Sequence, residues 1–444
     1  MKSLEKNLNK SGWLMILWIV CISSVPFYLW SQNDGNPYIP LRVPDRINLT
    51  VTDDPSTSVA VTWRTSTEVK EAFAEIVEAD ANPLSINKAE RFTANTEILA
   101  TNDGSYKDLT WKGVTAAYHS TIFQNLEPNT MYTYRVGSGN DWSEWFQFRT
   151  TNDKNDKFSF LYFGDAQTEM RSMWSKVIRQ AYAQAPDAKL IVYAGDLINR
   201  STRDQEWGEW FGAGSFIHAT IPNMPSPGNH EYGRGDEATE ISPFWRAQFT
   251  LPNNGPKELK ESVYFTDIQG VRFISLDAHA VEGLGMHIES QKIWLDSVLT
   301  HNPNKWTCVV FHHPIYSAKA TRDNKVMRET FKPLFDKYKV DLVLQGHDHA
   351  YARGMKNIPM KEGESGTMYV VSVSGPKMSD SNMEKKIWMD KLEVYTQLYH
   401  VITVDEDELQ YRAYTVVGDL FDGFNLIKRS GKVNNVVELS LCED

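Results

Sequence analysis

The segment FSFLYFGDAQ, residues Phe158–Gln167, places a continuous apolar run directly before a glycine and an aspartate. A second segment of the same pattern, LIVYAGDLIN, spans Leu190–Asn199. Between them, apolar residues recur at helical spacing from Met170 to Ala181. Strands that alternate with helices in this way are typical of a layered α/β domain. The sequence therefore predicts α/β structure over residues 156–444.

Further elements of the same kind follow along the chain. Apolar runs predict strands at residues 271–276, 308–311 and 342–344, with helices around 293–298 and 331–338. The C-terminal part returns to predicted strands, at residues 367–373, 395–404 and 409–417. Between them, the polar stretch Lys377–Lys391 is expected to be a surface loop.

Five polar clusters stand out in this part of the chain. They are Gly164-Asp165-Ala166-Gln167, Gly195-Asp196-Leu197-Ile198-Asn199, Gly228-Asn229-His230-Glu231, His312-His313-Pro314 and Gly346-His347-Asp348-His349. Four of them directly follow predicted strands, and the third follows a proline- and glycine-rich loop at residues 222–227. Because ligands of α/β sheets bind at the carboxyl ends of strands, we expect the clusters to form one site.

The residue types in these clusters form a set of metal ligands. Carboxylates, an amide oxygen and imidazoles suit Zn, Fe or Mn, and the lack of a thiolate excludes a structural zinc site of the cysteine type. Each cluster alone is a weak signal, since Gly-Asp often only ends a strand. Together they exceed what one tetrahedral ion needs, so we expect two ions that share a carboxylate. Such pairs, roughly 3.5–4 Å apart, clamp the attacking and leaving oxygens of a displacement and generate hydroxide near neutral pH.

The part of the chain before residue 153 has a different pattern. Short alternating runs, separated by turn signals such as Asp53-Asp54-Pro55, predict a set of strands. These are Ser58–Trp63, Ala72–Val77, Ser120–Phe123, Met131–Val136 and Glu144–Phe148. Their spacing predicts an all-β sandwich of the immunoglobulin or fibronectin III type over residues 45–152, and it contains no cluster that carries chemistry.

Length and charge limit the possible functions. A chain of 444 residues is longer than one core usually serves, which agrees with two domains. The formal net charge of −11 disfavours nucleic acid as a partner. A small phosphate ester remains possible as substrate, because bound metal ions reverse the local sign.

The N-terminus carries a predicted targeting segment over residues 1–32. Three lysines, Lys2, Lys6 and Lys10, precede an apolar run at residues 13–30, which is typical of an export signal or an uncleaved membrane anchor. We therefore expect an exported protein (secreted, periplasmic or anchored) that contacts a membrane only through this segment, followed by a linker at 33–44. Of the three cysteines, Cys21 lies in this segment, Cys308 is expected to be buried, and Cys442 to be a free thiol.

The order GD, GD, GNHE, HxP and GHxH resembles the calcineurin-like metallophosphoesterase superfamily. The preceding β-domain narrows the resemblance. The stretches at residues 61–63, 126–137 and 146–150, and Gly346–Arg353, are similar to purple acid phosphatases with an N-terminal fibronectin III-like domain. The resemblance covers about residues 45–444. It implies a dinuclear metal-dependent phosphoesterase that hydrolyses phosphate monoesters by attack of a metal-bound hydroxide.

The resemblance also implies a role for each ligand. Asp196 would bridge the two ions. The first ion would be bound by Asp165 and His349, and the second by Asn229, His312 and His347. His230 would lie beside the leaving group as general acid or stabiliser of the transition state, with Glu231 orienting it.

Two positions depart from the family pattern. Asn199 stands where purple acid phosphatases have an iron-binding tyrosine, and Gln167 stands where many other relatives have a histidine. We therefore expect no purple colour, and a first ion that uses an oxygen of Gln167 or Asn199, or water. Next to the expected ligand His312, His313 either lines the substrate pocket or packs.

Two alternative functions remain open. The same site would also suit a phosphodiesterase or nucleotidase. A cell-surface binding module with an inactive metal domain is the alternative from another class, motivated by the two departures. The remaining polar residues in the predicted loops, Arg200, Asp277, His279 and His287, are expected to be surface residues.

Overall fold

The computed structural model describes residues 36–101, 113–233, 239–355, 366–379, 383–386, 388–429 and 432–440. The predictions for the N-terminal targeting segment, Cys21 and Cys442 lie outside these ranges. Within them, no helix combines the length and the apolar character needed to cross a membrane. Cys308 is buried and unpaired, as predicted.

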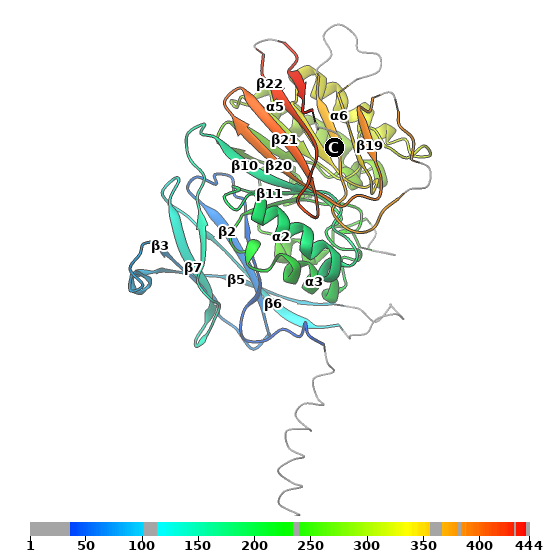
Figure 1. Ribbon diagram of the computed structural model, residues 1–444. Coiled ribbons are helices and arrows are strands. Elements are labelled where there is room, and N and C mark those ends of the chain that lie inside the picture. Colours follow the sequence, from blue (N-terminus) through cyan, green and yellow to red (C-terminus); the bar gives the residue numbers. More distant parts are fainter. Residues whose placement is uncertain are drawn as a thin grey trace, which may run out of the picture.

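The largest sheet runs through both predicted domains (Figure 1). Its eleven strands, in spatial order, are β23 (Asn435–Glu438), β22 (Leu420–Ile427), β21 (Glu408–Thr415), β20 (Leu398–Asp405), β10 (Phe158–Phe163), β11 (Ile191–Ala194), β12 (Asn223–Ser226), β1 (Asp45–Thr50), β2 (Val59–Thr65), β6 (Thr115–Phe123) and β5 (Asn95–Ala100). Strands β10, β11 and β12 are parallel neighbours, so their carboxyl ends lie at the same edge.

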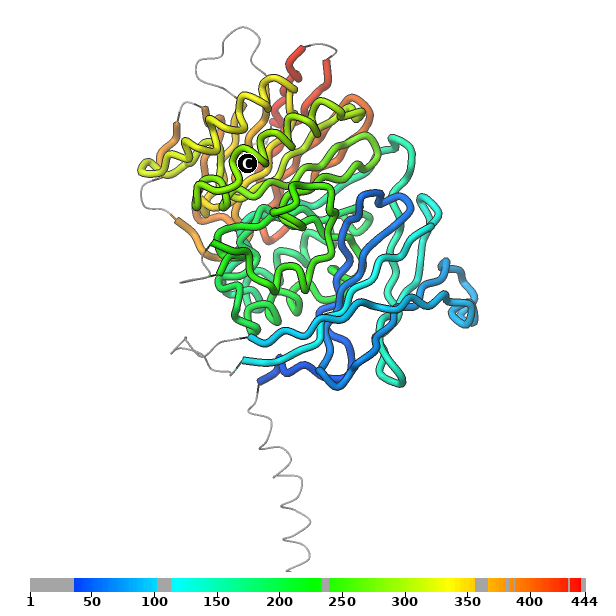
Figure 2. Tube along the Cα trace, turned by 180° about the vertical axis from the view of Figure 1, so that it is seen from behind, coloured from blue at the N-terminus to red at the C-terminus, as the bar shows by residue number. Residues whose placement is uncertain are grey.

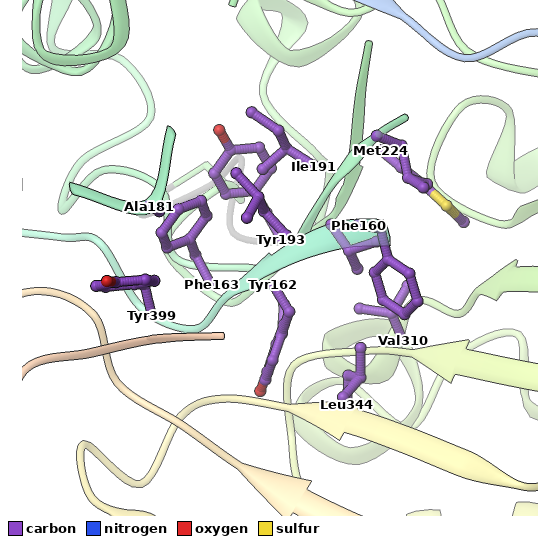
Figure 3. Packing of buried hydrophobic residues seen from close by; sticks show 14 of the residues in the cluster. Phe160, Tyr162, Phe163, Ala181, Ile191, Tyr193, Met224, Val310, Leu344 and Tyr399 are labelled. Atoms are coloured by element: carbon purple, nitrogen blue, oxygen red, sulfur yellow. The ribbon is translucent and has the colours of Figure 1, made fainter. Parts of the chain in front are cut away.

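A second sheet packs against the first. Its strands, in spatial order, are β13 (Tyr264–Ile268), β14 (Val271–Ser275), β15 (Trp306–Val310), β16 (Leu342–Gln345), β18 (Met368–Val371), β17 (Tyr351–Gly354) and β19 (Lys391–Glu393). The ring of Phe160 meets Phe273 edge-on at 5.0 Å between centroids. Val310 and Leu344 lie on the same side of β10 as Phe160, whereas Phe163 and Tyr193 point to the other side, with Ala181 (Figure 3).

Helices cover the two outer faces of this pair of sheets. On the first sheet lie the π-helical turn η3 (Met170–Trp174), α2 (Ser175–Gln184) and α3 (Asp204–Gly214), with η4 (Ser215–Ile217) and α4 (Pro243–Gln248) nearby. On the second lie η7 (His279–Gly283), α5 (Ile288–Thr300) and α6 (Lys325–Tyr338), with η6 (Lys257–Leu259). The α/β prediction is confirmed as a four-layered arrangement of helix, sheet, sheet and helix.

The N-terminal sandwich is completed by a third sheet. It consists of β4 (Glu90–Thr93), β3 (Phe73–Glu78), β7 (Met131–Ser138) and β8 (Asp141–Trp142), with β9 (Phe146–Arg149) on β7 and the turn η1 (Ser85–Lys88) beside β3. Trp63, Phe123 and Tyr134 fill the space between this sheet and the β2–β6 part of the large one. The all-β prediction for this region is confirmed.

Pairing of β1 with β12 joins the two regions. Thr50 lies opposite Asn223 in a parallel bridge, so the large sheet is continuous from the sandwich into the α/β part; the blue strands in Figure 2 run beside the green ones. The buried Arg64 reinforces this junction, because its guanidinium donates to both carboxylate oxygens of Asp204 at 3.0 and 3.1 Å. The N-terminal region thus stabilises the neighbouring strands of the α/β part.

The structure corrects two local predictions. The predicted loop at residues 222–227 contains β12, which pairs with β11 although Pro225 is in it. This proline is tolerated because β1 meets β12 only at Asn223, so the remaining edge needs no N–H donor for that neighbour. Likewise, the stretch 377–391 is not all surface loop, since Trp388 and Met389 are buried.

Candidate metal centre

All five polar clusters lie at the carboxyl ends of strands. Three follow β10, β11 and β12 of the large sheet, and two follow β15 and β16 of the second sheet. The third cluster therefore obeys the same rule as the others. Because the two sheets pack face to face, their clusters meet at a common edge, as the order of motifs predicted.

Close backbone approach makes this convergence possible. A Cβ on Gly228 would lie 2.2 Å from Oδ1 of Asp196, and one on Gly346 would lie 2.2 Å from Oδ1 of Asp165. Three site residues, Asp196, His347 and His349, have positive φ angles of 52°, 73° and 54°. Such left-handed backbone is costly for non-glycine residues and is found mainly where function requires it.

The side chains meet in two neighbouring groups. In each, the possible ligand atoms lie within 4.8 Å of one another: Asp165, Asp196 and His349 form one, and His312, His313 and His347 the other. Within the first, Nε2 of His349 lies 3.1 Å from Oδ2 of Asp165. Nε2 of His312 links the groups, at 3.1 Å from Oδ2 of Asp196 and 3.0 Å from Nδ1 of His347.

The donor set fits metal ions. Oδ1 of Asn229 and Oδ2 of Asp165 are buried, and neither has a hydrogen-bond partner among the described residues. Buried polar atoms are rarely left unsatisfied, and an ion would satisfy both of these oxygens. Nδ1 of His312 lies 2.8 Å from the carbonyl oxygen of Ala194, so a neutral His312 donates there and presents the lone pair of Nε2 to the site.

Backbone groups hold the carboxylates in place. Oδ1 of Asp165 accepts the amide N–H of His347 at 2.7 Å, and Oδ1 of Asp196 accepts that of His230 at 3.0 Å. The fully buried Glu231 accepts three amide N–H groups, from Asp196, Leu197 and Gly228. One carboxylate thus ties the second cluster to the third.

Strong electrostatic coupling marks the centre. Burial opposes the charged form of Asp196, but His312 and His230 outweigh burial and hold the pKa of Asp196 well below its usual range. Burial likewise opposes protonation of His312, yet Asp196 and Asp165 raise its pKa to about 9. Burial and the charge of Asp196 raise the pKa of Glu231 to about 8. A buried site with such a demand for positive charge is suited to cations.

His230 lies beside the ligand cluster with one nitrogen directed at it. Its Nδ1 donates to the carbonyl oxygen of Asn199 at 2.6 Å, while its Nε2 lies 3.8 Å from Oδ2 of Asp196. The side chain is 17% exposed, so it can reach a ligand in the pocket. Orientation of this ring was expected from Glu231, but the Asn199 carbonyl performs it, because the oxygens of Glu231 are turned to the backbone.

The two departures from the family pattern have a structural counterpart. Gln167 donates from Nε2 to Oδ2 of Asp196, and its Oε1 accepts from the ammonium of Lys377. The amide oxygen is therefore engaged with Lys377, in contrast to the expected ligand role. Asn199 acts through its backbone, with its N–H donating to Glu206 at 2.7 Å and its carbonyl accepting from His230.

Of the two alternatives for His313, the structure favours packing. Its ring centroid lies 4.1 Å from that of His347 and 5.5 Å from that of His279, and the residue is buried. Asp277 was expected at the surface and is instead fully buried, where it accepts from the Tyr232 hydroxyl at 2.7 Å. That prediction was wrong because the partner, Tyr232, which directly follows the third cluster, lies 45 positions away in the sequence.

Sequence reasoning missed three basic residues at the site. A pocket of about 320 Å³ is lined by Asp196, Asn229, His230, His347 and His349, and also by Lys319, Arg322, Lys377, Met378 and Ser379. Lys319 and Arg322 follow the His-His-Pro cluster by a few residues, and Lys377 lies after β18. No local motif marks these cations, and only the fold brings them to the ligands.

Comparisons with known families agree with this architecture. Residues 44–150 match a family model described as purple acid phosphatase, N-terminal domain, and residues 158–351 match calcineurin-like phosphoesterase. Together the two matches cover more than half of the 444 residues. Residues 158–351 thus form a calcineurin-like phosphoesterase domain, and the domain that precedes it is of the purple acid phosphatase N-terminal type.

Individual relatives are distant. The mouse (Mus musculus) acid phosphatase type 7 is 26% identical over 363 residues, which is 76% of each chain. The Fe(3+)-Zn(2+) purple acid phosphatase 12 of Arabidopsis thaliana is 24% identical over 251 residues, and the match spans 53% of this chain and 52% of that protein. This chain thus matches only about half of the length of the first matched relatives.

Among solved structures, purple acid phosphatase PPD1 from yellow lupin (Lupinus luteus) seeds has the same fold. It aligns with a TM-score of 0.72 over 88% of this chain and 75% of that chain, at 19% sequence identity.

Proposed function

We propose that this protein is a dinuclear metal-dependent phosphoesterase that hydrolyses phosphate monoesters, as an acid phosphatase does. One observation carries the proposal: six donor side chains from five strand ends converge, and two of their buried oxygens have no hydrogen-bond partner among the described residues. The calcineurin-like phosphoesterase domain, and the acid phosphatases among the relatives, support the same chemistry.

The proposed ligands fall into two half-sites that share Asp196. The first half-site comprises Asp165 and His349, and the second comprises Asn229, His312 and His347. The position of Asp196 supports this shared role, because its Oδ2 lies 3.1 Å from Nε2 of His312 while its main-chain oxygen accepts from the amide of Gln167, near Asp165. Fe, Zn and Mn all suit this donor set. When bound, the two ions supply positive charge for the phosphoryl oxygens and lower the pKa of water.

The chain's own residues perform the remaining steps. His230, fixed through Nδ1 by the carbonyl of Asn199, keeps Nε2 at the pocket surface, where a protonated imidazole donates to the departing ester oxygen. Glu231 and the tight glycine contacts hold the carboxylates, so little reorganisation is needed when charge develops in the transition state. Lys319 and Arg322 line the same pocket, whose volume of about 320 Å³ leaves room for the ester group.

The test is hydrolysis of p-nitrophenyl phosphate by protein reconstituted with Fe, Zn or Mn. Asp196→Asn and His230→Ala are expected to abolish or severely reduce turnover. His287→Ala is the matched control, because His287 lies outside the ligand cluster beside Glu258. Full activity of Asp196→Asn would refute the assignment.

Two companion measurements address the alternatives. Bis-p-nitrophenyl phosphate, compared with the monoester, separates a phosphodiesterase from a phosphomonoesterase. Metal analysis addresses a binding module with an inactive metal domain: two metals per chain with turnover would refute that function. The lysine-flanked apolar segment at the N-terminus supports the further proposal that the enzyme is exported.

A further inference from the structure

We propose that Lys319, Arg322 and Lys377 form a second anion subsite at the rim of the metal centre. This cationic rim would select phosphate monoesters that carry a second phosphate or carboxylate near the scissile group. The inference rests on the proposed function, and it names the substrate class of the same site.

The first argument is position. All three cations line the pocket of about 320 Å³ that also exposes His230 and four of the six proposed ligands. Lys319 and Arg322 come from one turn after β15, in which the amide of Arg322 donates to the carbonyl of Lys319 at 3.3 Å. Lys377 comes from the segment after β18, whose Gly375 amide donates to the carbonyl of Asp165 at 2.7 Å. The cationic rim is thus built from two segments that are anchored at the centre.

Two of the cations are held in place by neutral or buried partners. Nη1 of Arg322 donates to Oδ1 of Asp348 at 2.7 Å and to the carbonyl of His347 at 3.3 Å. Lys377 donates to the amide oxygen of Gln167, a neutral acceptor that leaves its charge uncompensated. No described side chain forms a hydrogen bond or ion pair with the ammonium of Lys319. Arg322 is thus paired with a carboxylate, whereas the ammonium groups of Lys319 and Lys377 have no carboxylate partner among the described residues.

Charge balance is the second argument. Asp348 is the buried carboxylate of the rim, and its oxygens already accept from Ser317, Ala318 and Arg322. Asp165 and Asp196 belong to the proposed metal ligands. Burial, then the nearby charge of Arg322, lowers the pKa of Lys319, although Asp348 partly offsets these effects. Like charges gathered around one pocket repel each other, and a bound anion would remove that cost.

A single ester phosphate does not account for this surplus. Its two charges would be matched by a metal pair, whereas the described residues of the rim add three cations against one carboxylate. An additional anionic group on the substrate would receive charge-assisted hydrogen bonds from Lys319 and Lys377, which are the strong kind. Substrates with one phosphate and no further charge would gain little from the rim.

The test uses non-hydrolysable probes, so that binding is measured apart from turnover. Calorimetry would compare methylphosphonate with methylenediphosphonate and phosphonoacetate on the full-length, metal-loaded protein. We expect Lys319→Met to weaken methylenediphosphonate binding about tenfold, which corresponds to ~1.4 kcal/mol, and methylphosphonate binding by less than about threefold. The diphosphonate and the phosphonoacetate arms show whether the second group is a phosphate or a carboxylate.

Lys377→Met provides a second variant with the same expected selectivity. Lys385→Met is the matched control, because it removes one exposed lysine outside the pocket. Elemental analysis after each titration shows whether a probe has removed metal from any of the four proteins, so that loss of metal is told apart from loss of probe binding. An unchanged ratio of the probe affinities in both Lys319→Met and Lys377→Met would overturn the proposal.

Turnover separates this inference from the proposed function. Suppose that the wild-type protein hydrolyses phenyl phosphate and 3-carboxyphenyl phosphate with equal kcat/KM, and that the ratio of the two values is unchanged in both variants. The rim proposal then fails, while the proposed phosphoesterase function stands. If no ester is hydrolysed with any metal, the proposed function fails, and the calorimetric comparison still reports on the rim.

Discussion

The two half-sites of the proposed metal centre share a carboxylate but differ in what surrounds it. In the second half-site, Asn229 offers an unsatisfied buried oxygen, and His312 is aligned by the carbonyl of Ala194. In the first half-site, Asp165 and His349 are the ligands besides the shared Asp196 among the described residues, and the neighbouring Gln167 is hydrogen-bonded to Asp196 and Lys377. The scaffold of strand ends is complete in both, so the difference arises from a few side chains.

This difference teaches that backbone geometry and metal affinity are separable. Gly164 and Gly195 each directly follow a strand, and both following aspartates accept backbone N–H groups. A donor lost at Gln167 or Asn199 therefore weakens one ion without disturbing the other. We expect a tightly held ion in the second half-site and a more weakly held one in the first.

The largest effect is expected from the residue common to both halves. Asp196→Asn removes a charge that both ions would need, so kcat for p-nitrophenyl phosphate should fall at least about a hundredfold, beyond the usual range for loss of a group that only supports a ligand. Steady-state kinetics and elemental analysis measure the two consequences. Asp407→Asn, an exposed aspartate paired with Lys305, is the control. Retention of two metals with a normal rate would mean that Asp196 is not shared.

A somewhat smaller loss is expected at Glu231. Its carboxylate accepts amide N–H groups from both the second and the third cluster. In a glutamine, the side-chain –NH2 group would point at some of these N–H groups and could not accept from them. Glu231→Gln should therefore weaken metal binding in both half-sites by about 10- to 100-fold. Competition with a calibrated chelator measures this, with Glu289→Gln on the exposed face of α5 as control. A loss confined to one half-site would contradict the bridging role of Glu231.

Most of this centre could be predicted from the sequence because each ligand sits in a local motif. The glycine before each aspartate, and the paired histidines of Gly346–His349, mark the strand ends whatever the tertiary structure. The strands β10, β11 and β15 were predicted because each is apolar throughout. By contrast, β12 was missed. Pro225 lies within this four-residue strand, and Pro222 and Pro227 flank it, so the segment has the composition of a loop.

What the sequence did not predict depends on long-range contacts. Lys377 lies 210 positions from Gln167, and no periodicity relates them. The role of the Asn199 carbonyl in orienting His230 is also invisible, because any residue at that position has a carbonyl. The same holds for the junction of β1 with β12, whose paired residues Thr50 and Asn223 lie far apart in the sequence.

The next prediction tests the ranking of the half-sites. On dialysis of the wild-type protein against increasing chelator, one metal equivalent should leave at a concentration at least about tenfold lower than the other, because the first half-site has fewer protein ligands. Asp165→Asn should abolish the weakly held equivalent and keep the tight one, and Asn229→Ala should do the reverse. Elemental analysis gives the stoichiometry. Loss of both metals in a single step would contradict the difference in affinity between the two half-sites.

The smallest effect is expected from an attempt to restore the missing donor. Gln167→His places an imidazole beside Asp165, at the position where many relatives have a histidine, and should tighten the first half-site. The gain should stay at about threefold to tenfold, short of what a full ligand contributes, because Lys377 loses its neutral acceptor and its charge then opposes an ion at this place. Chelator competition measures the gain, and Gln147→His, an exposed position of β9, controls for non-specific binding by an added histidine.

The double variant Gln167→His with Lys377→Met separates the two contributions. If the ammonium is what limits the gain, removing it should increase metal retention beyond that of Gln167→His alone, since a cation next to a bound cation is destabilising. An identical affinity of the single and double variants would show that Lys377 exerts no field on the first half-site. The asymmetry would then be due only to the number of donors, and the two halves would differ in ligand count but not in electrostatic environment.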